Sequence, residues 1–137
     1  MTTPRPPAER ASHLHGAGMP LEPGRGVDHV RSTLTHWGLD GGLPGTDALV
    51  VAGELLANAH QHAGGATALR LTWSGTRLRI EVSDNSSEPP GLITPHESTR
   101  LFGHGLYLVE RLSTRWGSRC RSEGKTVWAD LRLPHAP

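Results

Sequence analysis

The sequence contains very little cysteine and lysine. Cys120 is the single cysteine in 137 residues, so neither an internal disulfide nor a cysteine-based metal cluster can form. Lys125 is the single lysine, and arginine supplies the remaining basic residues. The formal net charge is only +1, which is not the signature of a nucleic-acid-binding protein, so we expect the arginines to be dispersed over a solvated surface.

Long apolar runs are also missing. No stretch approaches the roughly 18–20 apolar residues of a membrane-spanning helix. The first residues, Met1 to Pro7, lack the apolar core of a signal peptide. We therefore expect a cytoplasmic protein that acts on neither membranes nor nucleic acids directly.

The length of the chain suits one domain with one hydrophobic core. Residues 1–23 are rich in proline, glycine, alanine and histidine without periodicity, which predicts a disordered leader in which His13 and His15 are incidental. Residues 24–133 are then expected to form the domain, and residues 134–137 a short tail.

Periodicity within the domain predicts three helices and two hairpins. Apolar residues recur at helical spacing over residues 24–38, 46–64 and 106–112, whereas alternation marks strands at 66–73, 77–82, 116–121 and 125–133. Residues 39–45, rich in glycine and proline, are expected to be a loop, and the longer loop over 85–102 is expected to be a mobile lid. This order favours an α+β two-layer sandwich, with helices on one face of a mainly antiparallel, mixed sheet.

The second helix carries an unusual line of polar residues. Thr46 is expected to cap this helix and Gly64 to close it, while Leu49, Ala52, Leu56, Ala59 and Ala63 form its apolar stripe. Glu54, Asn58 and His62 follow at intervals of four, which places successive members about 6 Å apart along the axis. For this helix alone, a polar edge beside the core explains the line as well as a functional site does.

Two further features follow in the sequence, each weak by itself. Asp84 ends a predicted strand outside its alternating apolar set, so its removal is expected to leave the fold intact. Gly103-x-Gly105-Leu106 opens the third helix, where glycines let backbone amides approach an anion. His62 is not expected to complete a metal site, because Mg²⁺ prefers oxygen ligands.

Taken together, these motifs resemble the ATP-binding domain shared by gyrase, heat-shock chaperones, histidine kinases and mismatch-repair ATPases. The segment from Glu54 to Ala63, the run Gly103-His-Gly-Leu-Tyr-Leu-Val109 and the run Gly124-Lys-Thr-Val-Trp128 look most like the stand-alone anti-sigma-factor serine kinases. The resemblance spans about residues 24–133, and it implies the Bergerat-type ATP-binding fold.

The resemblance implies a role for each matching residue. Glu54 would be the general base, Asn58 the Mg²⁺ ligand, and Asp84 the acceptor of the adenine amine. Gly103, Gly105 and Leu106 would line the phosphate site, Thr126 would lie near the base and Asp84, and Arg100 is a candidate γ-phosphate contact. An amide oxygen at Asn58 also suits a hard cation that keeps several waters and phosphate oxygens.

One departure from the family pattern lies after Asp84. Ser86 and Glu88 stand where the family usually carries glycines, two and four residues after the aspartate. The intact Glu54 favours a kinase, whereas the altered second motif favours a switch that binds nucleotide without transferring phosphate.

The resemblance therefore predicts an ATP- and Mg²⁺-dependent serine/threonine protein kinase of the anti-sigma-factor type. Its expected partners are a sigma factor, which it would sequester, and a small antagonist protein, which it would phosphorylate. The alternative is a nucleotide-gated partner-binding switch without kinase activity. Related stand-alone kinases are often dimers, so a homodimer remains an alternative to a monomer.

Overall fold

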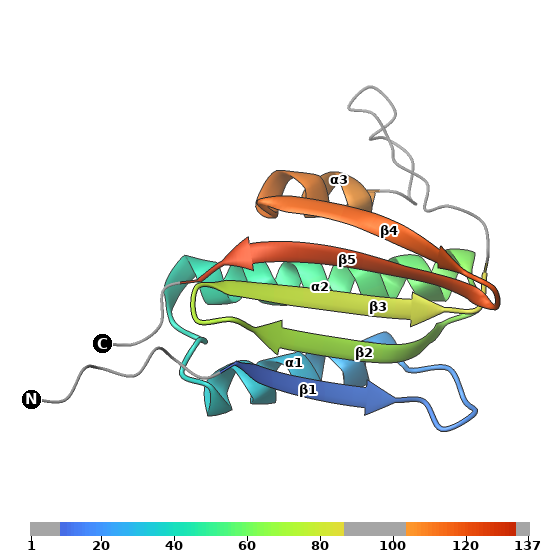
Figure 1. Ribbon diagram of the computed structural model, residues 1–137, viewed down its shortest axis with the longest axis horizontal. Coiled ribbons are helices and arrows are strands. Elements are labelled where there is room, and N and C mark those ends of the chain that lie inside the picture. Colours follow the sequence, from blue (N-terminus) through green and yellow to red (C-terminus); the bar gives the residue numbers. More distant parts are fainter. Residues whose placement is uncertain (1–8, 87–103, 134–137) are drawn as a thin grey trace, which may run out of the picture.

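The computed structural model describes residues 9–86 and 104–133, which form three helices and five strands (Figure 1). The strands are β1 (Arg10–His15), β2 (Ala66–Trp73), β3 (Arg77–Asp84), β4 (Arg115–Arg121) and β5 (Gly124–Arg132). The helices are α1 (Pro23–His36), α2 (Gly42–His62) and α3 (His104–Leu112). The predicted α+β class is confirmed.

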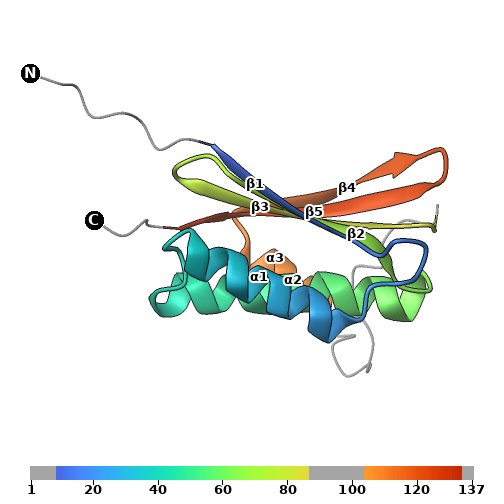
Figure 2. The ribbon, with the colours of Figure 1, turned by 90° about the horizontal axis from the view of Figure 1, so that it is seen from below.

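The strands form one sheet in the order β1-β2-β3-β5-β4, and every neighbouring pair within it is antiparallel. All three helices lie on the same face, so the described residues form two layers, and no described helix covers the other face of the sheet (Figure 2). We call this uncovered side the outer face.

The core lies between the two layers. Alternate residues of the strands point into it, among them Leu69, Leu71, Leu78, Ile80 and Val82, and all of these are fully buried. From α2, Ala52, Leu56 and Ala59 are buried as the apolar stripe predicts, whereas Leu49 and Ala63 are only partly buried. Helix α2 contacts both α1 and α3 and so is the central helix of its layer.

The prediction of a disordered leader over residues 1–23 is wrong for Arg10–His15, which form the edge strand β1. This strand pairs antiparallel with β2, and the inward-facing Ser12 hydrogen-bonds His29 of α1 at 2.8 Å. Its alternation is short and mostly polar, and its ladder bonds come from a strand more than fifty residues later. Local composition therefore could not reveal it.

Helix α2 begins four residues before the predicted start. Its N-cap is Gly41 rather than Thr46, whose hydroxyl instead donates to the Gly42 carbonyl inside the helix at 3.3 Å. Pro44 is tolerated because N–H groups in the first turn have no partner within the helix. At the other end Gly64 has a φ of 73°, which confirms it as the left-handed residue that ends the helix.

Candidate functional site

The candidate site lies at the end of the molecule where strands β2, β3 and β5 meet helices α2 and α3 (Figure 1). Ala66 at the start of β2, Asp84 at the end of β3 and Lys125 near the start of β5 form one row across the sheet. Helix α2 ends only a short turn before Ala66, and α3 begins toward this same end (Figure 1). The topology thus brings together three motifs that are far apart in the sequence.

The polar line of α2 differs in exposure from one residue to the next. Glu54 is half-buried, Asn58 is only 8% exposed and His62 is exposed. Asn58 lies four residues before the end of the helix, so it is about 6 Å along the axis from the turn that leads into β2. Along the helix axis, the buried residue Asn58 is therefore closer than Glu54 to Asp84's end of the sheet, and His62 is closer still.

Neither Glu54 nor Asn58 is engaged by another side chain. Within residues 9–86 and 104–133, no hydrogen bond or ion pair is found for either side chain. Asn58 as a residue is only 8% exposed, but its amide atoms are not among the buried, unpartnered polar atoms of the described residues, so the carboxamide still reaches solvent. The pair is free to bind a ligand and to accept a proton.

Asp84 is buried in an ion pair that the sequence did not predict. Its Oδ1 accepts a hydrogen bond from the Ser86 backbone N–H at 2.8 Å and one from Lys125 Nζ at 3.2 Å. Its Oδ2 lies 3.1 Å from the same Nζ, and both side chains are almost completely buried. The single lysine of the chain therefore neutralises the aspartate expected to recognise adenine.

One oxygen of this carboxylate still lacks a well-aligned donor. Asp84 Oδ2 is buried and has no hydrogen bond of acceptable geometry among the described residues, although Nζ lies close to it. The ion pair satisfies its charge but not its directional hydrogen-bonding capacity. An exocyclic amine of a nucleotide base is a donor of the kind that this oxygen lacks, so the carboxylate has the chemistry to accept a base that carries such an amine, adenine among them.

Close packing at the start of β5 supports this ion pair. A Cβ on Gly124 would collide with the Asp84 carbonyl oxygen and lie 2.9 Å from Asn85 Cα. Arg121 donates from Nη2 to the Asp84 carbonyl at 3.2 Å, which ties the end of β4 to the same corner. Glycine is thus required at position 124 because two backbones approach each other there.

The structure does not bring the Thr126 hydroxyl to Asp84. In the β3–β5 register Thr126 pairs with Ser83, and their hydroxyls are 2.9 Å apart on the outer face of the sheet. Lys125 is the residue beside Asp84, because successive strand residues point to opposite faces. The alternation expected for residues 125–133 already puts Lys125 and Thr126 on opposite faces of the sheet, whereas the resemblance to the family motif predicted Thr126 near Asp84.

The third motif, Gly103-x-Gly105-Leu106, lies at the start of helix α3. Gly105 is the second residue of the helix, so its backbone N–H belongs to the first turn, whose amides have no partner within the helix and favour anions. Leu106 is fully buried in the hydrophobic core, so it anchors α3 rather than lining a ligand site. Gly103, Arg100 and most of the expected lid over 85–102 lie outside the described residues.

Acidic and histidine side chains do not add a further metal site in the described part of the chain. Over 9–86 and 104–133, no three His, Cys, Asp or Glu residues are grouped so as to hold a metal ion. A cation at this site would therefore depend on the Asn58 amide oxygen together with oxygens of the nucleotide, as Mg²⁺ bound to phosphates commonly does. Among the described helices, none is both long and apolar enough to cross a membrane.

Comparison with curated proteins gives no significant match. A solved structure, the histidine kinase domain from the Erythrobacter litoralis EL346 blue-light activated histidine kinase, matches at 22% identity with a TM-score of 0.49. That match covers 81% of this chain but only 59% of the kinase domain.

The family comparison covers more than half of the chain. Residues 46–136 match the family described as histidine kinase-, DNA gyrase B-, and HSP90-like ATPase. The matched region begins in α2 and includes Glu54, Asn58, Asp84, Gly105 and Lys125, so it contains the whole candidate site. The chain belongs to the histidine kinase-, DNA gyrase B- and HSP90-like ATPase family, whose domains bind ATP.

Proposed function

We propose that the protein is a regulatory serine/threonine kinase of the anti-sigma-factor type. It would use ATP to phosphorylate a small antagonist protein and would sequester a sigma factor until that antagonist competes. The observation that carries the proposal is the pair Glu54 and Asn58 on α2, unengaged by other described side chains and one helical turn apart. A general base and a metal-binding amide need this freedom and this spacing.

In the proposed reaction each residue has a separate task. Asp84 would accept a hydrogen bond from the adenine amine through Oδ2, which favours adenine over guanine. The amides at the start of α3 would bind phosphate oxygens, and Asn58 would hold Mg²⁺, which neutralises phosphate charge. Glu54 would orient the substrate hydroxyl and receive its proton.

The proposed phosphoryl transfer needs only ATP and the hydroxyl of the antagonist protein as reactants. The oxygen of a serine or threonine hydroxyl forms a bond to the γ-phosphorus, and the bond from that phosphorus to the β,γ-bridging oxygen breaks. ADP leaves with the bond's electron pair, and the hydroxyl proton passes to Glu54. Because such transfers owe much of their rate to positioning and charge neutralisation, losing the base slows the reaction without abolishing it.

A second candidate is a nucleotide-gated switch that binds its partner without transferring phosphate. The Asp84–Lys125 ion pair favours the switch, because the adenine of a nucleotide must compete with the buried Lys125 ammonium for the Asp84 carboxylate. The two candidates share the ATP site and differ only in chemistry.

Glu54→Gln separates the candidates. The glutamine keeps the shape but cannot take the proton, so phosphorylation of the antagonist should fall about 10²- to 10⁴-fold while ATP affinity barely changes. Asn58→Ala should lose Mg²⁺-dependent ATP binding as well as transfer. The assay isolates proteins that bind the wild-type chain, adds radiolabelled ATP with Mg²⁺, and maps phosphoserine or phosphothreonine by mass spectrometry.

His60→Gln provides the matched control, since His60 is exposed on the same helix outside the polar line. It should leave both ATP binding and transfer unchanged. If the wild-type chain binds a partner in an ATP-dependent way but transfers no phosphate, the switch replaces the kinase.

A further inference from the structure

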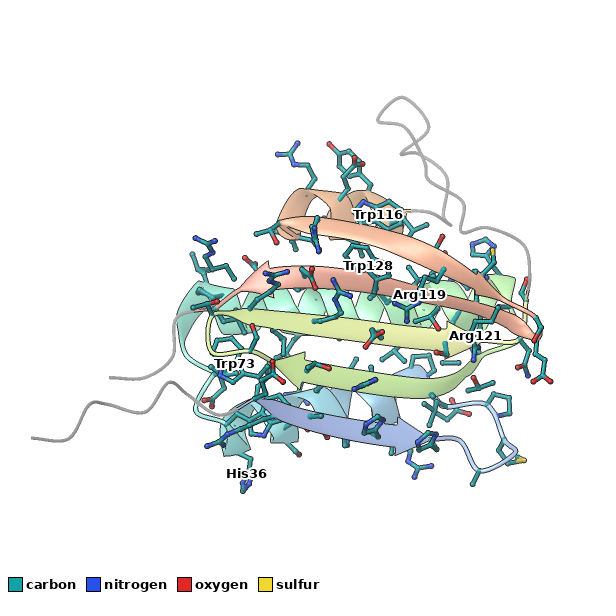
Figure 3. All side chains as sticks on the ribbon, viewed as in Figure 1. His36, Trp73, Trp116, Arg119, Arg121 and Trp128 are labelled. Carbon is teal, nitrogen blue, oxygen red and sulfur yellow. The ribbon has the colours of Figure 1, made fainter. Side chains whose placement is uncertain are left out.

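The outer face of the sheet gathers arginines that are dispersed in the sequence. Strand alternation directs seven of them onto this face from four adjacent strands, namely Arg70, Arg77, Arg79, Arg115, Arg119, Arg121 and Arg132. Arg119 lies over the uncovered side of the sheet together with Trp128 (Figure 3). The sequence-based expectation of dispersed arginines is therefore wrong for this surface.

A buried carboxylate organises one half of the arginine set. Asp130 is fully buried, and its two oxygens accept hydrogen bonds from Arg79 Nε and Nη2 at 2.7 and 2.9 Å. Arg115 Nε donates to it at 3.2 Å, and Arg77 Nη1 lies 3.6 Å away. Burial alone would raise the pKa of Asp130, but these guanidinium groups outweigh it and lower that pKa. Asp130 is thus a charged anchor for three arginines.

Glu81 does the same for the other half. It accepts a hydrogen bond from Arg119 at 3.0 Å and lies 3.9 Å from Arg70, so from its place on β3 it links β2 on one side to β4, beyond β5, on the other. Two carboxylates therefore hold five arginines in place, and the face keeps a net positive charge. The side chains of Arg70, Arg77, Arg115 and Arg119 remain 51–62% exposed, so their remaining N–H donors face solvent.

A shallow depression of about 490 Å³ lies among these side chains, and Arg70, Arg77, Arg79 and Arg119 line it. Its floor is the paired strands, and its rim is basic on several sides. Fixed guanidinium forks bind carboxylates and phosphates through two parallel hydrogen bonds. The shape and the donors suit an acidic segment lying across the strands.

The imidazoles of His13 and His15 on β1 stack on each other at the edge of this face. Among the described strands, Trp128 is the only tryptophan, tyrosine or phenylalanine that faces this side, and its surroundings argue against nucleic acid as the occupant. The guanidinium carbon of Arg79 lies 4.4 Å from the Trp128 ring centroid, and that of Arg115 lies 5.6 Å away. On β4, a Cβ at Gly117 would lie 2.9 Å from this ring, so the ring also packs against the neighbouring strand. A ring covered in this way offers no free platform for base stacking, on which single-stranded nucleic-acid binding depends.

We propose that the outer face is a docking surface for an acidic segment of a partner protein, whose carboxylates bind the arginines anchored by Asp130 and Glu81. The surface is separate from the candidate ATP site, because α2 and α3 lie on the opposite side of the sheet (Figure 2). A second copy of the chain is a poor occupant, since its own outer face carries the same positive charge.

The test uses the full chain and a fluorescein-labelled twelve-residue peptide rich in glutamate and aspartate. Arg70→Gln combined with Arg119→Gln removes two exposed charges from the face. Arg25→Gln combined with Arg31→Gln removes two exposed charges from α1 and is the matched control. The Arg70→Gln, Arg119→Gln double variant loses two exposed charge contacts of modest strength, so its affinity for the peptide should fall about tenfold. The control double variant should change the affinity for the peptide less than twofold.

A second measurement needs no variant. Adding the peptide to the isotopically labelled wild-type chain should shift backbone amide resonances of β2, β3, β4 and β5 and leave those of α1 unshifted. Affinity should also fall steeply between 50 and 200 mM salt, as expected for exposed charges.

Four results would overturn the proposal. They are no peptide binding at millimolar concentration, equal losses in both variant pairs, shifts confined to the helices, and tighter binding of a twelve-nucleotide single-stranded RNA than of the peptide. The last result would assign the face to nucleic acid instead. None of these outcomes depends on ATP binding, so the proposal fails or stands apart from the proposed kinase.

Discussion

At the scale of single residues, Asp84 is the position where structure changes the expectation most. Its place at a strand end suggested that it could be removed without loss of stability. The carboxylate is instead buried against Lys125, and removing one partner of a buried ion pair leaves an uncompensated charge in the interior. The same residue therefore serves both stability and nucleotide recognition.

We expect Asp84→Ala to lower the free energy of unfolding by about 3–5 kcal/mol, because it leaves the Lys125 ammonium buried without a counter-charge. Its ATP affinity should fall about 10- to 150-fold, the worth of a hydrogen bond to a charged group. Urea denaturation and calorimetric titration with ATP measure the two effects.

The control is the double variant Asp84→Leu with Lys125→Met, which removes both charges and leaves no side-chain acceptor at position 84. It should recover most of the lost stability without recovering ATP binding. If the double variant bound ATP as well as the wild type, Asp84 would not be the adenine contact.

The buried Asp130 carboxylate should make the stability of the protein depend on pH in the acid range. Its pKa is lowered in the folded state from an ordinary value near 3.8, so its contribution to stability is present above that value and is lost as pH falls through the folded pKa. Asp130→Asn should cost about 1.5–3 kcal/mol at pH 7, discounted because the partner arginines are partly exposed.

Below about pH 4, the difference between the two proteins should shrink as the wild-type carboxylate takes up its proton. Melting temperatures of wild type and Asp130→Asn from pH 7 to pH 3 measure it. A difference that stays constant over this range would mean that Asp130 is not ionised in the folded protein.

At the scale of elements, the junction of β3 and β5 determines whether the candidate site is assembled. The two strands pair over their whole length, and Asp84 and Lys125 close the ladder at the end that faces α2 and α3. Gly124 lets the chain turn into β5 directly against the Asp84 carbonyl. A side chain there would push the two halves of the ion pair apart.

Gly124→Ala should therefore lower stability by about 1–3 kcal/mol or more and weaken ATP binding in parallel. Gly53→Ala in α2 is the control, because a Cβ there meets only Val27 of α1, at an ordinary contact distance of 3.5 Å. That substitution should be neutral or stabilise the protein by up to about 1 kcal/mol, since alanine favours helix. Thermal denaturation with and without ATP compares them, and equal effects would show that the junction tolerates a side chain.

At the scale of the whole molecule, β1 joins the helical layer to the edge of the sheet. Leu14 packs against the core, and Ser12 hydrogen-bonds His29 on α1. Burial lowers the pKa of His29, so its neutral form stabilises the fold above the ordinary value of 6.5 and this contribution is lost as pH falls.

Removing residues 1–15 should cost about 2–3 kcal/mol, from one hydrogen bond and one partly buried leucine. It should also return the pKa of His29 toward 6.5, because the side chain becomes solvated. Proton NMR titration of His29 and urea denaturation measure both, and an unchanged His29 titration would mean that β1 does not cover it. Full-length Ser12→Ala is the control, which should lose only the hydrogen bond.

The sequence by itself determined the α+β class, the position of most helices and strands, and the family to which the chain belongs. Helical and alternating periodicities are local, so they are readable without the fold, and the spacing of Glu54 and Asn58 follows directly from helix geometry. Tertiary structure alone decided that β1 exists, that α2 starts at Gly42, that Lys125 rather than Thr126 accompanies Asp84, and that arginines from four strands share one face. Each of these depends on strand register and on contacts between residues far apart in the chain, and no local pattern encodes which distant residue becomes a neighbour.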